Sequence, residues 1–473
     1  MDNFTKLNEN DIRYDRSFVI LSAEKPEIAA LKSIGSSIIN NPILLCFKLI
    51  TTANLILLGH FLYEGKVQYQ LFMTFQIGVF ILEFFGKCFI MGLLKYMFGT
   101  NNDLRILYKL YINMKTALIF VIPLIIIPFS ICSYYMIDII FEYTLEIHDK
   151  RLISDVYKKY LLFTPIIYFF EILFLHNLRF LQAWNKTKKV FMYIIGYLAC
   201  HVTGSLLLYM FLDFGLFGIT LSYGINSFIY FMYTDIKVYN FVKLDAKDYF
   251  YIIPNKYNFN WGIVTLLKQL SAYSLINLGE IFPNQFIFFV SLFIDKNQLI
   301  ANIIYLNFFE LITEIIRGFY YTIKKDICMK YQDTIERQKF VLFFSIFYSI
   351  ISLTIFIILL LFKNILLNIY IYNGGNPILQ KIAGNMKILY SLCILLMSIK
   401  FLLGGIVRGL EIAVSNIRRL IYMLICIGFC WLFCFGNEFG IYGLWISLLI
   451  LDVLHVCENG LKTINNFPLG YAA

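Results

Sequence analysis

Long apolar stretches alternate with short polar segments along most of the 473-residue chain. A transmembrane helix needs about 17–25 predominantly apolar residues to cross the hydrocarbon core of a bilayer. The pattern therefore predicts an all-α polytopic membrane protein with twelve transmembrane helices. The predicted spans cover residues 42–63, 70–94, 116–138, 159–178, 190–212, 215–236, 262–292, 298–320, 340–362, 383–407, 416–436 and 438–457.

The least apolar interior stretch, residues 237–261, divides these spans into two sets of six. Because each half has an even number of spans, both halves begin on the same side of the membrane. The expected organisation is an N-terminal tail, a first lobe of six spans, a linker, a second lobe of six spans and a C-terminal tail, at residues 1–41, 42–236, 237–261, 262–457 and 458–473.

Lysine and arginine are concentrated in every second segment between the spans, which is typical of cytoplasmic loops. Residues 317–339 carry six of them, whereas the fifth and eleventh loops carry none. The third loop is an exception, but it is also rich in acidic residues. We therefore predict that both termini and the linker face the cytoplasm. The polar first 35 residues contain no apolar signal sequence, so the first span is expected to act as the targeting signal.

An internal repeat supports two equivalent halves. The sequence Phe-Gly-Leu-Phe-Gly at 214–218 opens the sixth span, and Phe-Gly-Ile-Tyr-Gly at 439–443 opens the twelfth, 225 positions later. Repeats that begin on the same side of the membrane are related by an axis along the membrane normal. We therefore expect two pseudo-symmetric six-helix lobes, with Gly215 equivalent to Gly440.

Composition excludes several classes of function. Apolar residues make up 60% of the chain and charged residues 15%, which is incompatible with a soluble protein. The net charge of +10 lies scattered between apolar stretches and does not indicate nucleic-acid binding. The ten cysteines show no metal-binding spacing, and Cys426, Cys430 and Cys434 are interpreted as small buried hydrophobes. No phosphate-binding loop is present, so ATP is not expected to be the direct energy source. We expect no catalytic residue, metal or cofactor.

The seventh span carries a polar face in an otherwise apolar stretch. Asn277, Glu280 and Asn284 lie at i, i+3 and i+7, and therefore on one side of a helix. A charged side chain at the centre of a bilayer costs at least ~2.5–3.5 kcal/mol, so an acid there is a functional candidate. Glu280 is thus a candidate to bind and release a proton. The alternative is a glutamate that makes only structural hydrogen bonds.

The eighth span places four polar residues on one face, namely Asn307, Glu310, Glu314 and Arg317. Glu314 and Arg317 are spaced to form a structural ion pair, whereas Glu310 is a candidate cavity residue. In the tenth span, Lys400 is expected either to pair with an acid across the cavity or to stand as a fixed positive charge.

Three histidines are interpreted as structural. His60 and His201 lie in an apolar context or near the ends of spans, and are expected to form hydrogen bonds within the bundle. In the last span, Asp452 and His455 are expected to form a local pair.

Several segments in order resemble one family. The first span ends in Leu-Leu-Gly-His at Gly59 and His60, and the fourth contains Pro165 and ends in Leu-Arg-Phe-Leu-Gln-Ala-Trp at 178–184. The fifth span contains a His-Val pair that begins at His201. The tenth span ends in Gly-Gly-Ile-Val-Arg-Gly, and the last span begins with Gly-Ile-Tyr-Gly. Over residues 40–457 the chain resembles the multidrug and toxic compound extrusion (MATE) transporters, especially their eukaryotic branch.

This resemblance implies two lobes arranged as a V, alternating access, and export of organic cations or amphipathic xenobiotics in exchange for H⁺ or Na⁺. It places Glu280 at the cation-coupling acid of the seventh span. Several family positions differ: Gln285 replaces a second glutamate, Met397 replaces an acid, Lys400 replaces a glutamine, Ile316 replaces a proline, and the second-span segment around Leu82 and Glu83 lacks one residue. The expected substrate cavity contains Asn277, Asn284, Gln285, Asn307, Glu310 and Lys400.

The leading functional prediction is a secondary active antiporter, not an enzyme. Its expected partners are a small organic substrate, H⁺ or Na⁺ and the lipid bilayer, without nucleic acid, and the protein is expected to be a monomer. It is expected in the plasma membrane or in a vacuolar or vesicular membrane. One alternative is a flippase for a lipid-linked or amphipathic substrate, and another is a non-transporting membrane scaffold.

Overall fold

The computed structural model describes residues 25–40, 42–61, 104–144, 147–184, 186–212, 214–242, 252–254, 263–264, 267, 282–330, 334–361, 365–371, 377–410, 412 and 416–466. The secondary structure of these residues is entirely helices and turns. The predicted second span, and the part of the seventh span that contains Asn277 and Glu280, lie outside the described residues.

The helices follow one another in the order that the apolar pattern predicts. The first half contains α1 (Pro26–Asn40), α2 (Pro42–Phe61), α5 (Leu104–Thr144), α6 (Ile147–Ala183), α7 (Thr187–Met210) and α8 (Gly215–Val242). The second half contains a helix over 282–291, then α10 (Lys296–Lys330), α11 (Thr334–Leu361), α12 (Ile365–Tyr370), α13 (Pro377–Gly409), α14 (Asn416–Trp431), the π-helical turn η4 (Leu432–Gly436) and α15 (Ile441–Asn466).

Eight of the described helices are long and apolar enough to cross a membrane. Most of the membrane-crossing residues of α6 and α10 are buried, whereas few of those in α11 and α14 are. On α11, the exposed side chains of Leu342, Ile346, Ile350 and Leu353 follow a helical spacing of three to four residues. An apolar stripe of this kind suits contact with lipid tails, so the protein is an integral multi-pass membrane protein.

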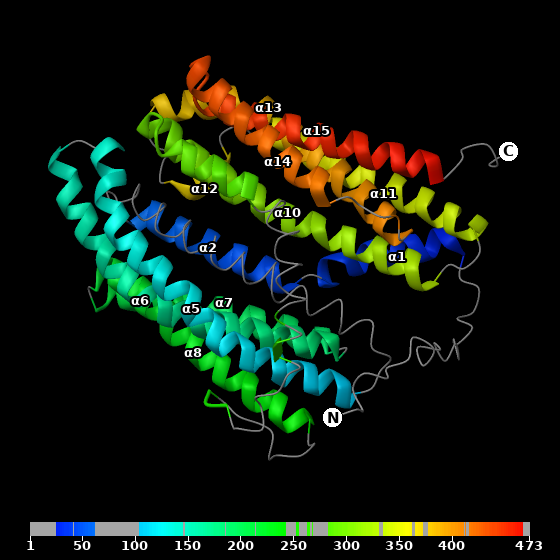
Figure 1. Cartoon of the computed structure of the whole chain (residues 1–473), viewed down its shortest axis with the longest axis horizontal. Coiled ribbons are helices and arrows are strands. Elements are labelled where there is room, and N and C mark those ends of the chain that lie inside the picture. Colours follow the sequence, from blue (N-terminus) through cyan, green and yellow to red (C-terminus); the bar gives the residue numbers. More distant parts are fainter. Residues whose placement is uncertain are drawn as a thin grey trace.

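The helices form two bundles, and each has its own apolar core (Figure 1). In the first bundle α6 packs against α5 and α8, and α7 packs against α8. In the second, α13 packs against α10, α11 and α15. The blue helix α2 lies between the bundles and contacts α7 on one side and α10 and α12 on the other. The expected two-lobe architecture is therefore present, with α2 where the lobes meet.

Equivalent glycines begin the last helix of each lobe. A Cβ atom on Gly218 would come within 3.0 Å of the Leu208 carbonyl carbon, at the end of α7. A Cβ atom on Gly443 would come within 2.6 Å of the Phe433 carbonyl carbon, in η4. Both members of the second pair lie 225 positions after those of the first, so the repeat seen in the sequence is also a repeat of backbone contacts. Each helix starts so close to the preceding one that a side chain does not fit.

Helix α1 was not predicted, because its residues were assigned to a tail. Its small residues Ala29, Ala30 and Ser33 are buried, and the helix packs against α10 and α11. The Ser33 hydroxyl donates a hydrogen bond to Asp326 of α10. A helix that packs through small side chains has no long apolar run, which explains why the hydropathy pattern missed it. Helices α8 and α15 continue past their predicted ends at 236 and 457, to Val242 and Asn466, and so enter segments that were assigned to the linker and the C-terminal tail.

Candidate functional site

A buried ion pair joins the two lobes. The Lys48 ammonium on α2 contacts a carboxylate oxygen of Glu310 on α10, and their side chains are only 3% and 2% exposed. Charged groups are rarely buried unless they are paired, because removing each from water is costly. Lys48 and Glu310 neutralise each other, but only while α2 and α10 stay in contact.

Neighbouring polar side chains extend this contact. The Gln285 amide donates to the second carboxylate oxygen of Glu310 at 3.3 Å. One turn away, the Thr52 hydroxyl donates to Asn307 Oδ1 at 2.8 Å, and the Tyr370 hydroxyl donates to the same oxygen at 2.7 Å. We call this set the interlobe polar site; its residues are Lys48, Thr52, Gln285, Asn307, Glu310 and Tyr370.

Three of the predicted cavity residues therefore belong to one site: Gln285, Asn307 and Glu310 are all buried within it. Asn284 lies beside Gln285 on the helix 282–291 and is partly exposed. Asn277 and Glu280 lie outside the described residues. Their place next to this site stays a prediction.

Lys400 forms an ion pair within its own lobe. Its ammonium pairs with Asp452 of α15 inside the second lobe, because α13 packs along α15. Asp452, the expected local partner of His455, is thus engaged by Lys400. The His455 ring packs edge-on against Tyr422, with 5.2 Å between the ring centroids. Helix packing brought Lys400 to Asp452, and the local sequence gave no indication of it.

The predicted ion pair between Glu314 and Arg317 is present on α10. The Arg317 guanidinium also lies over the ring of Phe401, with its central carbon 5.3 Å from the ring centroid. The two histidines also form bundle contacts as expected. His201 bonds Asn54 Oδ1 of α2 at 2.7 Å, and His60 bonds the Ile369 carbonyl of the second lobe at 2.8 Å.

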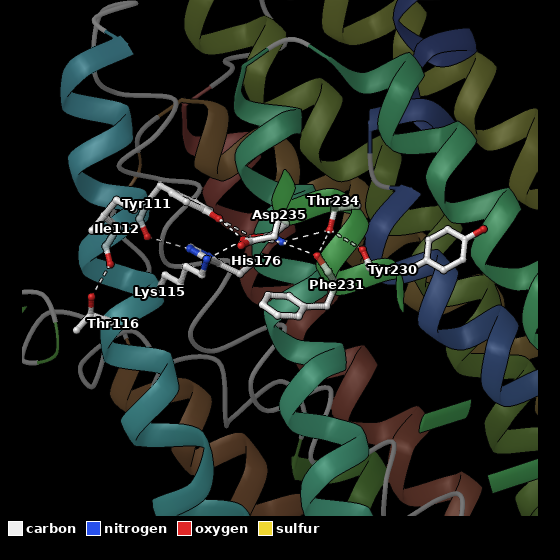
Figure 2. Close-up of polar contacts among 10 residues, drawn as sticks. Tyr111, Ile112, Lys115, Thr116, His176, Tyr230, Phe231, Thr234 and Asp235 are labelled. Atoms are coloured by element: carbon white, nitrogen blue, oxygen red, sulfur yellow. Dashed lines mark hydrogen bonds and ion pairs between the residues drawn. The ribbon is translucent and has the colours of Figure 1, made fainter. Parts of the chain in front are cut away.

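A second ion pair lies wholly inside the first lobe (Figure 2). Lys115 of α5 reaches Asp235 of α8 at 2.7 Å, and both side chains are fully buried. The Tyr111 hydroxyl donates to Asn177 Oδ1 at 2.7 Å, and the Asn177 amide donates to Asp235 at 3.3 Å. The His176 ring stacks on Tyr111, with 4.7 Å between centroids. This network ties α5, α6 and α8 together.

Sequence reasoning missed the residues that complete these networks. Lys48 and Lys115 stand near the ends of predicted spans, where positive charges are common. Their partners lie 262 and 120 positions further along the chain. Glu171 was also missed, although an acid within the span-like sequence Phe-Phe-Glu-Ile-Leu-Phe is itself an indication of function.

Comparison with known proteins identifies the fold. Neither a family model nor a curated protein matches the sequence. The structure is similar to that of the eukaryotic MATE transporter AtDTX14, with a TM-score of 0.70 and 15% identity, over 93% of this chain and 96% of that chain. It is similar to an inward-facing MATE family transporter of the MOP superfamily, with a TM-score of 0.64 and 12% identity, over 95% and 100% of the two chains.

A third solved structure is also similar. It is a MOP superfamily transporter from Pyrococcus furiosus, described as having a binding pocket of reverse polarity that suggests a different function. Its TM-score is 0.65 at 12% identity, over 93% of this chain and 96% of that chain. The protein is therefore an integral membrane protein with the MATE fold, as the sequence motifs predict.

Proposed function

We propose that the protein is a secondary active transporter that exports organic cations or amphipathic solutes in exchange for H⁺ or Na⁺. The observation that carries this proposal is the interlobe polar site. Lobes that had to stay together would be joined more cheaply by apolar packing than by a buried ion pair. A contact between Lys48 and Glu310 can be exchanged for water when the lobes part, which suits alternating access.

The same contact offers a way to couple ion binding to opening. A proton or Na⁺ that neutralises Glu310, or a cationic substrate that binds it, competes with Lys48 for the carboxylate. Such a ligand favours the conformation in which α2 has moved away from α10, because it binds that conformation better. Coupling then follows from one shared acid, without any covalent chemistry.

Glu280 is proposed as the acid that takes up the coupling cation. It precedes Gln285 by five positions in the seventh span and shares its helical face with Asn277 and Asn284. We propose that these residues line the substrate cavity with Asn307 and Glu310. We assign Lys400 instead to an ion pair with Asp452 that stabilises the second lobe.

The remaining features of the proposal come from the charge pattern and the resemblance. We propose a monomer with both termini in the cytoplasm, located in the plasma membrane or in a vacuolar or vesicular membrane. Its partners are a small organic solute and H⁺ or Na⁺.

Uptake into proteoliposomes tests this function. The purified protein is reconstituted, and accumulation of the fluorescent cation ethidium is followed under an imposed pH gradient, an imposed Na⁺ gradient or neither. Glu280→Gln should abolish gradient-driven accumulation, because it fixes the neutral form of that side chain. Glu314→Gln is the matched control, compared at equal amounts of reconstituted protein, and should lower transport much less, since Glu314 pairs with Arg317. A wild type that accumulates nothing under either gradient would contradict the proposal.

A second candidate, a flippase for an anionic lipid-linked substrate, is favoured by Arg179. This guanidinium on α6 is 1% exposed and donates one hydrogen bond, to Gln182 at 2.9 Å. Its Nε and Nη2 have no hydrogen-bond partner among the described residues. A buried arginine with spare donors is suited to bind a phosphate group. Translocation of a fluorescent anionic phospholipid in the same vesicles, lost in Arg179→Gln, would favour the flippase.

A further inference from the structure

An acid of the first lobe lies apart from the interlobe polar site. Glu171 of α6 has a fully buried side chain. The Tyr223 hydroxyl of α8 donates a hydrogen bond to Glu171 Oε2. Glu171 Oε1 has no hydrogen-bond partner among the described residues. In the part of the chain that the structure describes, the carboxyl group thus has one neutral partner and one oxygen without any.

The helices described around Glu171 bring no positive charge to it. Tyr223 faces Glu171 from α8. The ring of Tyr223 packs against the rings of Tyr168 on α6 and His201 on α7, with 6.4 and 5.2 Å between the ring centroids. The two buried lysines of α5 and α2 are engaged elsewhere, Lys115 with Asp235 and Lys48 with Glu310. Among the described residues, no ion pair involves Glu171.

An unpaired carboxylate in this position would be costly. A buried charge without a partner of opposite charge costs several kcal/mol, even after the surrounding structure relaxes. A structural acceptor for Tyr223 would not require an acid, because a glutamine oxygen accepts the same bond. What a glutamate adds is the capacity to hold a proton when closed in and to release it when exposed.

We propose that Glu171 is a proton-binding site of the first lobe, separate from the interlobe polar site, which carries its proton in the conformation described here. When the proton leaves, the bond that breaks is the carboxyl O–H, and the proton passes to water. The carboxylate that remains keeps the Tyr223 hydroxyl as donor. The use of this proton in transport rests on the proposed function, whereas its binding does not.

Helix α2 connects this acid to the lobe interface. His201 bonds Asn54 on α2 at 2.7 Å, and Thr52, two positions earlier, bonds Asn307 of the second lobe at 2.8 Å. His201 Nδ1 and Asn54 Nδ2 are buried without partners among the described residues. A movement of α2 away from α10 would therefore alter the polar surroundings of His201 and Tyr223, and could open Glu171 to water.

Infrared spectroscopy of the full-length protein in lipid nanodiscs tests the proton site directly, without a substrate. Spectra are recorded from acidic to alkaline pH for wild type, Glu171→Gln and Glu310→Gln. The wild type should show the carbonyl absorption of a buried protonated carboxyl group, and this absorption should disappear reversibly at alkaline pH. It should be absent from Glu171→Gln and retained in Glu310→Gln, since Glu310 is paired with Lys48 as a carboxylate.

The variant Tyr223→Phe keeps the acid and removes its donor. Its carbonyl absorption should persist at a shifted frequency, even if the variant is less stable. An absorption unchanged in Glu171→Gln, or one present at every pH, would overturn the proposal. Ethidium uptake driven by a pH gradient is the second readout. Glu171→Gln should lower it at least about tenfold and Glu171→Asp should restore part of it.

The two readouts separate the proton site from the transport function. Loss of the absorption in Glu171→Gln together with an inactive wild type would retain the proton site and reject the transport function. Wild-type uptake that is unchanged in Glu171→Gln would overturn the role of Glu171 in coupling.

Discussion

Lys48 of α2 and Glu310 of α10 form a buried ion pair across the boundary between the two lobes. Both side chains are buried, so each charge is stabilised mainly by protein groups, the other member of the pair among them. The boundary is therefore held by a contact that is strong when formed and costly when half broken. An interface of this kind favours two discrete arrangements over a continuum of intermediate ones.

Removing one partner of this pair should be more harmful than removing both. Lys48→Met leaves a buried carboxylate without its cation and should lower the free energy of unfolding by about 3–5 kcal/mol. The double variant Lys48→Met with Glu310→Met should recover most of that loss. Denaturant unfolding of the detergent-solubilised protein measures both.

A control pair on α15 calibrates this result. Lys462→Met breaks a partly exposed contact with Glu458 and should cost no more than about 1 kcal/mol. Equal losses of unfolding free energy in Lys48→Met and Lys462→Met would show that the interlobe pair contributes no more to stability than a partly exposed pair.

The two repeated glycines should differ in their tolerance of a methyl group. Gly443→Ala places Cβ within 2.6 Å of backbone atoms that cannot easily move, and Gly218→Ala within 3.0 Å. Gly443→Ala should therefore lower the melting temperature more, by a loss of about 1–3 kcal/mol in stability. Gly428→Ala, with no atom within 4 Å of the new Cβ, should raise stability slightly. The melting temperatures of the three variants should therefore increase in the order Gly443→Ala, Gly218→Ala, Gly428→Ala.

Lys400 should matter for stability and not for the substrate. Because its ammonium pairs with Asp452 inside the second lobe, Lys400→Gln should lower the melting temperature but leave the Kd for ethidium within about twofold of wild type. Fluorescence titration with ethidium measures the affinity. A large loss of affinity in Lys400→Gln would return this residue to the substrate cavity, where the sequence first placed it.

The sequence predicts the framework of this protein more fully than its contacts. Apolar length defines the spans, and the spacing of Gly218 and Gly443 carries the repeat, since both depend on local features. The shared face of Asn307 and Glu310 on one helix follows from helical periodicity alone. These properties need no knowledge of which helix lies next to which.

Partners on different helices could not be predicted. Lys48 has no feature that indicates Glu310, and Lys400 points to Asp452 only once α13 and α15 are packed together. The small residues of α1 gave no apolar signature, although the helix packs against the second lobe. Glu171 is a different case, because an acid among aromatic and aliphatic residues is visible in the sequence and was simply passed over.

Cross-linking across the lobe boundary tests the central claim most directly. Thr52 and Asn307 touch in the described conformation, with 2.8 Å between the hydroxyl and the amide oxygen. Thr52→Cys with Asn307→Cys is joined by a short, reducible thiol cross-linker and reconstituted in proteoliposomes. A matched control joins two helices of one lobe through Gly204→Cys and Ser222→Cys, where a Cβ on Gly204 lies 3.7 Å from Ser222 Cβ.

If the lobes must part during transport, the Thr52–Asn307 cross-link should abolish gradient-driven ethidium uptake, and a reducing agent should restore it. The Gly204–Ser222 cross-link should leave uptake unchanged, because it joins α7 and α8 within one lobe. Uptake at the uncross-linked rate with Thr52 and Asn307 joined would contradict alternating access at this boundary.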